Sequence, residues 1–261
     1  MSESIVITSG KGGAGKSLIT AGLAAQLAKQ GKRVVAIDMD VGLRSLDILF
    51  RMENSVVYDI ADVLDGICPL KQAIMRSKVY DGVSLINAPQ FGDSSSISVE
   101  HMDEVVAQLK EMYDYVLIDC PAGIGRGFHN SIAAVDRAIL VTLPESICLR
   151  DAERALGLLE LKGMDKVDVV LNRVRPCHMQ KNAAGGIAHA VEMLNRNVIG
   201  VVPEDAAVAA SNAKGASPEL MKNASGAAFE RIARRLNGEN VPLQYPRLSL
   251  FDRLRGMFSE S

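Results

Sequence analysis

A glycine-rich stretch near the start of the chain has the residue types and spacing of a phosphate-binding loop. It fits the pattern Gly-x-x-x-x-Gly-Lys-Ser/Thr, and its residues are Gly10, Lys11, Gly12, Gly13, Ala14, Gly15, Lys16 and Ser17. Glycines allow successive backbone N–H groups to turn inward around an anion. The sequence therefore predicts that this loop binds the phosphates of a nucleotide; the alternative is a glycine-rich turn that arose by chance.

The segments on either side of the loop are of the kinds that phosphate binding requires. Residues 5–8 form a β-branched run that predicts a strand, and residues 17–30 have helical apolar spacing that ends at Gly31. A helix that begins at the loop adds the partial positive charge of its N-terminus. In this arrangement Lys16 is expected between the β- and γ-phosphates, and the Ser17 hydroxyl is expected to bind Mg²⁺.

Carboxylates follow two further apolar runs that predict buried strands. Residues 33–37 lead into Asp38 and Asp40, and residues 113–118 lead into Asp119 and a glycine-containing loop. Ligands of open α/β sheets lie beyond the carboxyl ends of the strands. We therefore expect the first two carboxylates to face Mg²⁺ and the γ-phosphate, and Asp119 to hold a water ligand of the metal. A turn with a purely structural role would explain the first pair equally well.

Lys11 gives the loop a second cation two residues before Gly13. With this lysine, the loop resembles the variant phosphate loop of the MinD/ParA family of ATPases. In that family the extra lysine reaches the phosphates of the partner subunit in a dimer that encloses two nucleotides. The resemblance also implies that Asp38 supports the metal shell and that Asp40 positions the attacking water. A solvated surface lysine is the alternative for Lys11.

The resemblance covers nearly the whole chain and assigns the base-binding residues. Asn172 resembles the family asparagine whose amide meets the adenine edge, with Arg173 beside it, and the turn of Pro203 and Glu204 is expected to close over the base. All four residues could instead be ordinary strand-to-loop caps. The serine-rich stretch 94–96 departs from the family pattern, so the chain is a divergent member.

Strands alternating with helices predict an α/β fold with a mainly parallel, doubly wound sheet and helices on both faces. Further strands are expected over 82–86, 137–143, 167–171 and 198–202, and further helices over 58–73 (short), 99–112, 127–135, 149–161 and 219–236. This phosphate-loop ATPase domain is expected to span residues 1–238. A linker rich in Gly, Asn and Pro follows over 239–246.

The last segment, residues 247–259, has the pattern of an amphipathic helix. Its apolar residues share one helical arc, and they are Leu250, Phe251, Leu254, Met257 and Phe258. Arg253 and Arg255 flank this arc, where their heads can reach lipid phosphates. We predict that the helix lies on a membrane surface; the alternative is that it docks on its own domain.

Composition narrows the possible functions. The chain has 261 residues, no tryptophan and a net charge of −2, from 29 Lys and Arg against 31 Asp and Glu. This balance argues against a DNA-binding surface. The four cysteines are scattered, which favours free thiols in a reducing cytosol over a metal cluster, including at Cys177-His178. We expect neither a signal peptide nor a membrane-spanning helix.

The resemblance implies the function of the family members that place the bacterial division septum. Such a protein is a Mg²⁺-dependent ATPase that dimerises with ATP and binds the anionic inner surface of the cytoplasmic membrane. It recruits the division inhibitor MinC, and a MinE-type regulator stimulates hydrolysis; its expected location is the cytoplasm and the inner membrane. The alternatives are a ParA-type positioner of DNA or cargo, a flagellar-number regulator, and a metabolic transferase or reductase of the same fold.

Overall fold

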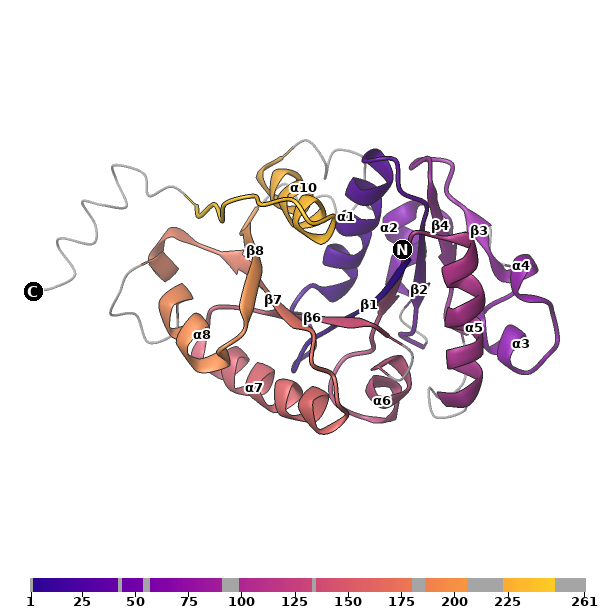
Figure 1. Ribbon diagram of the computed structural model, residues 1–261, viewed down its shortest axis with the longest axis horizontal. Coiled ribbons are helices and arrows are strands. Elements are labelled where there is room, and N and C mark those ends of the chain that lie inside the picture. The colour runs from indigo at the N-terminus through magenta and orange to yellow at the C-terminus, as the bar shows by residue number, and fades with distance from the viewer. Residues whose placement is uncertain are drawn as a thin grey trace, which may run out of the picture.

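The fold is known from a computed structural model of the chain (Figure 1). The structure describes residues 2–41, 44–53, 57–90, 99–132, 135–179, 186–205 and 223–246. Residues 247–259, including the five apolar residues of the expected amphipathic helix, lie outside this description. So do residues 219–222, where we placed the start of the last helix of the domain.

A single mainly parallel sheet organises the described chain and confirms the predicted fold class. Its strand order is β3-β4-β2-β5-β1-β6-β7-β8, and β3 pairs with β4 as the antiparallel edge. The strands are β1 (Glu3–Thr8), β2 (Val34–Asp38), β3 (Met75–Arg76), β4 (Val83–Ile86), β5 (Tyr115–Asp119), β6 (Arg137–Thr142), β7 (Val167–Val174) and β8 (Asn197–Pro203).

Helices cover both faces of the sheet (Figure 1). One layer packs on a core that includes side chains of α3 (Ile60–Leu64), α4 (Leu70–Ala73), α5 (Val99–Met112), α6 (Arg126–Ile132), α7 (Ser146–Leu161) and α8 (Ile187–Leu194). The other layer consists of α1 (Lys16–Lys29), α2 (Ser45–Phe50) and α10 (Ala224–Leu236). A short 3₁₀ turn, η2 (Pro176–Met179), follows β7.

Both faces of the sheet are apolar because the middle residues of its central strands are apolar. In β1, Val6 points to the layer of α5 and α6, whereas Ile5 and Ile7 point to the layer of α1 and α10. In β5, Val116 and Leu117 divide between the two layers in the same way. Successive side chains of a strand alternate between faces, so a strand covered on both sides reads as an unbroken apolar run.

Four parts of the structure differ from the sequence-based expectations. The helices α2 and α8 and the edge strand β3 lie where we expected no such elements. Strand β7 extends to Val174, so Asn172 and Arg173 lie within it and not after its end. The cysteines of the chain agree with the expectation of free thiols. All four are free. Cys177 and His178 lie in η2, where the His178 Nδ1 accepts the backbone N–H of Arg175 at 3.1 Å.

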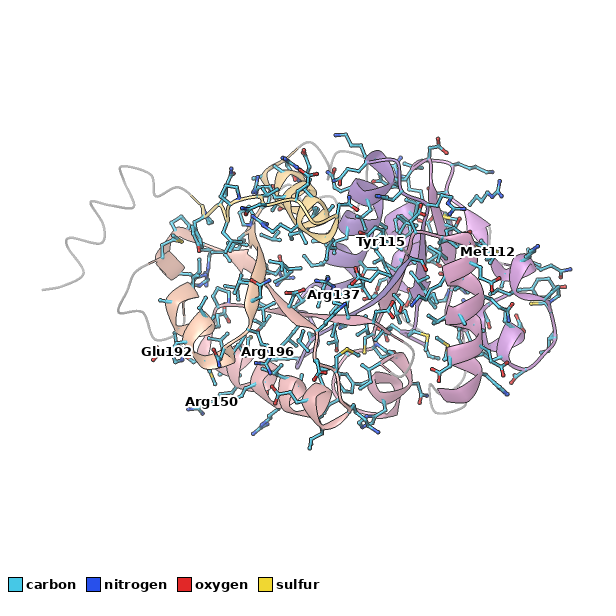
Figure 2. The ribbon with its side chains drawn as sticks, in the orientation of Figure 1. Met112, Tyr115, Arg137, Arg150, Glu192 and Arg196 are labelled. Carbon is cyan, nitrogen blue, oxygen red and sulfur yellow. The ribbon has the colours of Figure 1, made fainter. Side chains whose placement is uncertain are left out.

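Arg137, the first residue of β6, joins the N-terminal ends of neighbouring strands (Figure 2). Its guanidinium lies 2.9 Å from Glu3 of β1 and 2.6 Å from Asp168 of β7. These partly buried pairs join three adjacent strands. They hold together the ends of these strands that lie opposite the phosphate loop.

The chain after α10 is also held to the body. Arg235 donates from Nη1 to the carbonyl oxygen of Ile199 in β8 at 2.7 Å. It also donates to the carbonyl oxygens of Val241 at 2.8 Å and Pro242 at 2.7 Å. The first residues of the segment that we expected to be a linker are therefore fixed against α10 and β8.

The contact between α1 and α10 depends on a glycine. A Cβ atom on Gly22 would lie 2.4 Å from the ring of Phe229, which is fully buried. The absence of a side chain at Gly22 therefore lets the two helices pack closely. In α7, by contrast, a Cβ atom on Gly157 would meet nothing within 4 Å.

We predict opposite effects for the same substitution in these two helices. Gly22→Ala should lower the free energy of unfolding by about 1–3 kcal/mol, because overpacking outweighs the gain in helix propensity. Gly157→Ala should raise it by up to about 1 kcal/mol. Urea unfolding measures both, and Phe229→Leu should relieve the penalty at position 22. If Gly22→Ala and Gly157→Ala changed the free energy of unfolding equally, this account of the contact between α1 and α10 would be wrong.

Candidate nucleotide-binding site

The phosphate loop joins β1 to α1, and its glycines are required for two different reasons. Gly13 and Gly15 have φ angles of +80° and +94°, which residues with a side chain rarely adopt. At Gly10 the constraint is space, because a Cβ atom there would lie 1.9 Å from the carbonyl oxygen of Asp151 in α7. The loop therefore rests directly on the backbone of α7.

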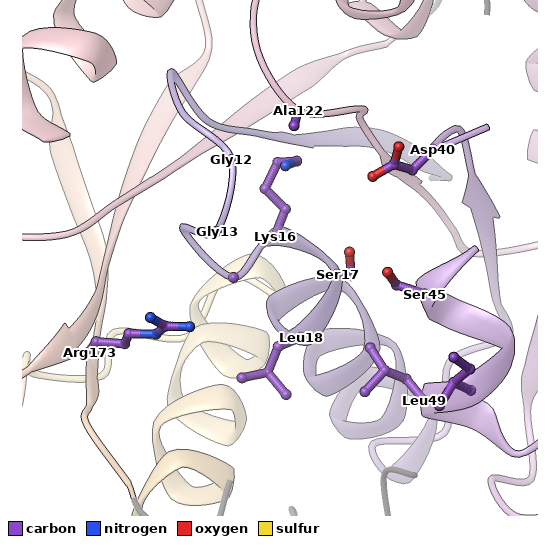
Figure 3. Close-up of a pocket in the computed structure, with 12 residues that line it drawn as sticks. Gly12, Gly13, Lys16, Ser17, Leu18, Asp40, Ser45, Leu49, Ala122 and Arg173 are labelled. Carbon is purple, nitrogen blue, oxygen red and sulfur yellow. The ribbon is translucent and has the colours of Figure 1, made fainter. Parts of the chain in front are cut away.

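Two cavities open on either side of this loop. The larger cavity has a volume of about 460 Å³. Lys16, Ser17 and Asp40 line one side of it, and Arg173 lines the other (Figure 3). The second, about 260 Å³, lies between the loop and α7. Its lining includes Lys11 together with Thr142, Glu145, Cys148 and Arg173. The two lysines of the loop thus face different cavities.

Three carboxylates lie near one another at the carboxyl ends of β2 and β5, and one of them, Asp40, lines the larger cavity. Asp38 and Asp119 are register partners in these adjacent strands, and both are buried. Asp38 accepts the backbone N–H groups of Asp40 at 2.9 Å and Leu46 at 3.0 Å. Asp119 accepts the Thr20 hydroxyl at 3.4 Å through Oδ1, whereas its Oδ2 has no hydrogen-bond partner.

Burial and mutual repulsion make these carboxylates difficult to ionise. Burial, followed by the charge of Asp38, raises the pKa of Asp119 to about 8 despite the Ser17 hydroxyl and Lys16 nearby. Burial likewise raises the pKa of Asp38 to about 6, against its two backbone hydrogen bonds. At Asp40, burial raises the pKa and Lys16 partly offsets the rise. The cluster therefore needs additional positive charge if all its members are to ionise.

These residues fit a Mg²⁺ ion that a nucleotide helps to hold. Asp119 offers an unpartnered buried oxygen, and the Ser17 hydroxyl lies beside it. Within the described residues, no three His, Cys, Asp or Glu side chains could hold a metal ion as a group. Mg²⁺ typically combines one or two protein oxygens with waters and substrate phosphates, so this sparse donor set suits it.

The expected base-binding residues also lie at or near the carboxyl ends of the strands. The Asn172 side chain is buried and donates from Nδ2 to the carbonyl oxygen of Ala14 at 2.8 Å. Arg173 has a φ angle of +50° and lines both cavities. Pro203 ends β8, and the Glu204 backbone N–H donates to the Val174 carbonyl oxygen at 3.0 Å. Their roles toward adenine stay predictions.

Sequence reasoning missed the wall of the larger cavity that α2 supplies. Ser45, Ile48 and Leu49 line it, and Ser45 points toward Ser17 (Figure 3). The apolar spacing of residues 45–50 was a signal for a short helix. Its first turn, however, is held by the distant Asp38 carboxylate, which accepts the backbone N–H of Leu46.

An ion-pair cluster at the ends of β6, β7 and β8 was also missed. The Arg175 guanidinium lies 3.5 Å from Glu145 and 3.7 Å from Glu204. It therefore links the segments that follow three neighbouring strands. His178 packs beside this arginine, and burial together with the arginine charge lowers the pKa of its imidazole.

Comparison with known proteins agrees with this site. The sequence profile described as "CobQ/CobB/MinD/ParA nucleotide binding domain" matches residues 5–218. The chain belongs to this family. It is 42% identical to the septum site-determining protein MinD of Synechocystis over 93% of its own length and 92% of that protein. The predicted resemblance to the MinD/ParA ATPases is thus confirmed.

Solved structures extend the similarity to the whole fold. A MinC:MinD cell division protein complex from Aquifex aeolicus matches with a TM-score of 0.85 at 37% identity, over 94% of this chain and 100% of that one. Pyrococcus horikoshii MinD complexed with Mg-ADP matches with a TM-score of 0.80 at 28% identity, over 91% and 96% of the two chains. Among the helices that the structure describes, none is long and apolar enough to cross a membrane.

The raised pKa of Asp119 predicts a pH-dependent effect of Asp119→Asn. Without metal or nucleotide, the folded chain retains a proton that the unfolded chain has lost, so wild-type stability falls as pH rises from about 4 to about 8. The stability of the variant relative to wild type should therefore increase by about 1–3 kcal/mol between pH 5.5 and pH 8. Urea unfolding in EDTA measures this difference.

Added Mg²⁺ and ATP should make wild type more stable than Asp119→Asn at pH 8, because the ionised carboxylate then gains a cation. A variant whose relative stability is the same at both pH values would show that Asp119 does not titrate in this range.

Proposed function

We propose that this chain is a Mg²⁺-dependent ATPase that acts as a membrane-associated switch in placing the division septum. The observation that carries the proposal is the phosphate loop set against the buried pair Asp38 and Asp119. Its similarity to septum site-determining MinD proteins supports the cellular role. The P. horikoshii neighbour with Mg-ADP supports a nucleotide and Mg²⁺ as ligands.

Hydrolysis at this site would depend on positioning and charge. The backbone N–H groups of the loop and the Lys16 ammonium bind the phosphates. Ser17 would bind the Mg²⁺ ion and Asp119 would hold one of its water ligands, and the ion would supply positive charge to the phosphate oxygens. Asp40 orients the attacking water, and Asp38 fixes the backbone of Asp40 through the hydrogen bond at 2.9 Å.

Lys11 is proposed to act across a homodimer that forms with ATP. It lies in the exposed part of the loop and faces the second cavity, away from Lys16. Two polyanionic nucleotides that face one another require cations from both subunits. The side of the loop that carries Lys11 can supply such a cation to the partner.

The proposed partners follow from the relatives and from the C-terminal segment. The A. aeolicus complex of MinC with MinD supports MinC as a partner, and a MinE-type protein is the proposed activator. The anionic inner membrane is the proposed surface for Leu250, Phe251, Leu254, Met257 and Phe258. The protein would then divide its time between the cytoplasm and the membrane. A ParA-like role on DNA is not favoured, because the net charge is −2.

Two substitutions in the larger cavity should separate binding from hydrolysis. Lys16→Ala should abolish ATP binding, because it removes the cation between the phosphates. Asp40→Ala should bind ATP and Mg²⁺ normally but lower phosphate release by about 100-fold or more. Calorimetry and a phosphate-release assay measure the two quantities, with the exposed Asp81→Ala as the control. Full turnover by Asp40→Ala would remove that residue from the mechanism.

Sedimentation with anionic vesicles should link the dimer to the membrane. Wild-type chain should sediment with ATP and not with ADP, because two weak helices in one dimer bind with useful avidity. Lys11→Ala should bind ATP but stay monomeric and soluble. Phe251→Asp should dimerise in light scattering without sedimenting. Vesicle binding by a chain truncated at Arg247 would show that the anchor lies elsewhere.

A further inference from the structure

The Asn172 side chain is packed against the phosphate loop itself. Its Nδ2 donates to the carbonyl oxygen of Ala14 at 2.8 Å, and a Cβ atom on Gly15 would lie 2.3 Å from the same nitrogen. Asn172 is only 2% exposed. The amide therefore fills the space behind the loop and leaves little of its surface accessible.

Both ends of this amide have defined partners. Oδ1 accepts the backbone N–H of Arg173 at 2.9 Å, while Nδ2 donates to Ala14. Rotating the amide by half a turn would place oxygen against oxygen and N–H against N–H, so one orientation is strongly preferred. Arg173 has a positive φ angle of +50°, and β7 is irregular between Leu171 and Val174. This irregular part of the strand presents Asn172 to the loop.

The hydrogen bond to Ala14 fixes the direction of a phosphate-binding donor. In a trans peptide the carbonyl oxygen and the following N–H point in opposite directions. Because Asn172 holds the Ala14 carbonyl, the Gly15 N–H must point away from Asn172. Gly15 lines the larger cavity. An N–H that is already oriented requires no rearrangement when an anion binds.

We propose that Asn172 is a positioning residue for the phosphates, because its amide braces the loop at Ala14 and Gly15. The inference rests on the nucleotide site of the proposed function and deepens it. It gives Asn172 a task that does not involve the base. If Asn172 contacted only the adenine amino group, its substitution would leave the affinity for inosine triphosphate unchanged, because that nucleotide lacks the amino group.

Asn172→Asp tests this brace with an almost isosteric change. The carboxylate cannot donate to Ala14, and it repels the carbonyl oxygen. In the nucleotide-free protein, the backbone amides of Gly13–Lys16 should exchange hydrogen faster than in wild type. Affinity for ATP and for inosine triphosphate should fall together by about tenfold, which corresponds to about 1.4 kcal/mol and lies within the cost of leaving a buried acceptor unsatisfied.

Asn237→Asp is the matched control. The Asn237 amide also has two partners, Gln30 at 2.6 Å and the Tyr115 hydroxyl at 2.9 Å, but it lies at the far edge of the sheet. Its substitution should destabilise the fold without changing exchange in the loop. Unchanged loop exchange in Asn172→Asp, or a loss of ATP affinity with inosine triphosphate unaffected, would overturn the proposal. If the wild-type chain bound neither nucleotide while loop exchange was still faster in Asn172→Asp, the result would support the brace and refute the proposed function.

Discussion

Two carboxylates that occupy the same register position on adjacent buried strands impose the main constraint on this structure. Asp38 and Asp119 cannot both ionise in an apolar environment without a compensating cation. Lys16 supplies part of that charge, and the rest has to come from outside the chain. The site is therefore least stable when it is empty, and a bound nucleotide with its metal ion would stabilise it. Stability is lower at the place where binding is required.

The phosphate loop stays ordered beside this unfavourable cluster because it is supported from two sides. At Gly10 it rests on the backbone of α7, and at Ala14 it is held by Asn172 of β7. Both supports come from the half of the sheet that lies across β1 from Asp38 and Asp119. The strands that carry the carboxylates and the strand that carries the brace are thus different, which separates metal binding from loop geometry.

Local patterns predicted the elements that local physics determines. The helix α5 begins and ends at the expected residues, Val99 and Met112, because its apolar side chains repeat with helical spacing. The short α2 was missed because its first turn depends on a hydrogen bond to Asp38, eight residues earlier than Leu46. The loop motif could be read directly. The contact of Asn172 with Ala14 could not, since it joins residues 158 positions apart.

The central position of β1 has a consequence for synthesis of the chain on the ribosome. Its partners are β5 and β6, so β1 waits for about 110 residues before a neighbouring strand exists. At about 5–20 residues per second this interval is on the order of 5–20 s. The brace at Asn172 is translated later still, and so is Phe229, which packs on Gly22. A nascent chain therefore cannot use nucleotide binding to guide its early folding, and the side of α1 that packs on Phe229 stays uncovered until α10 has been made.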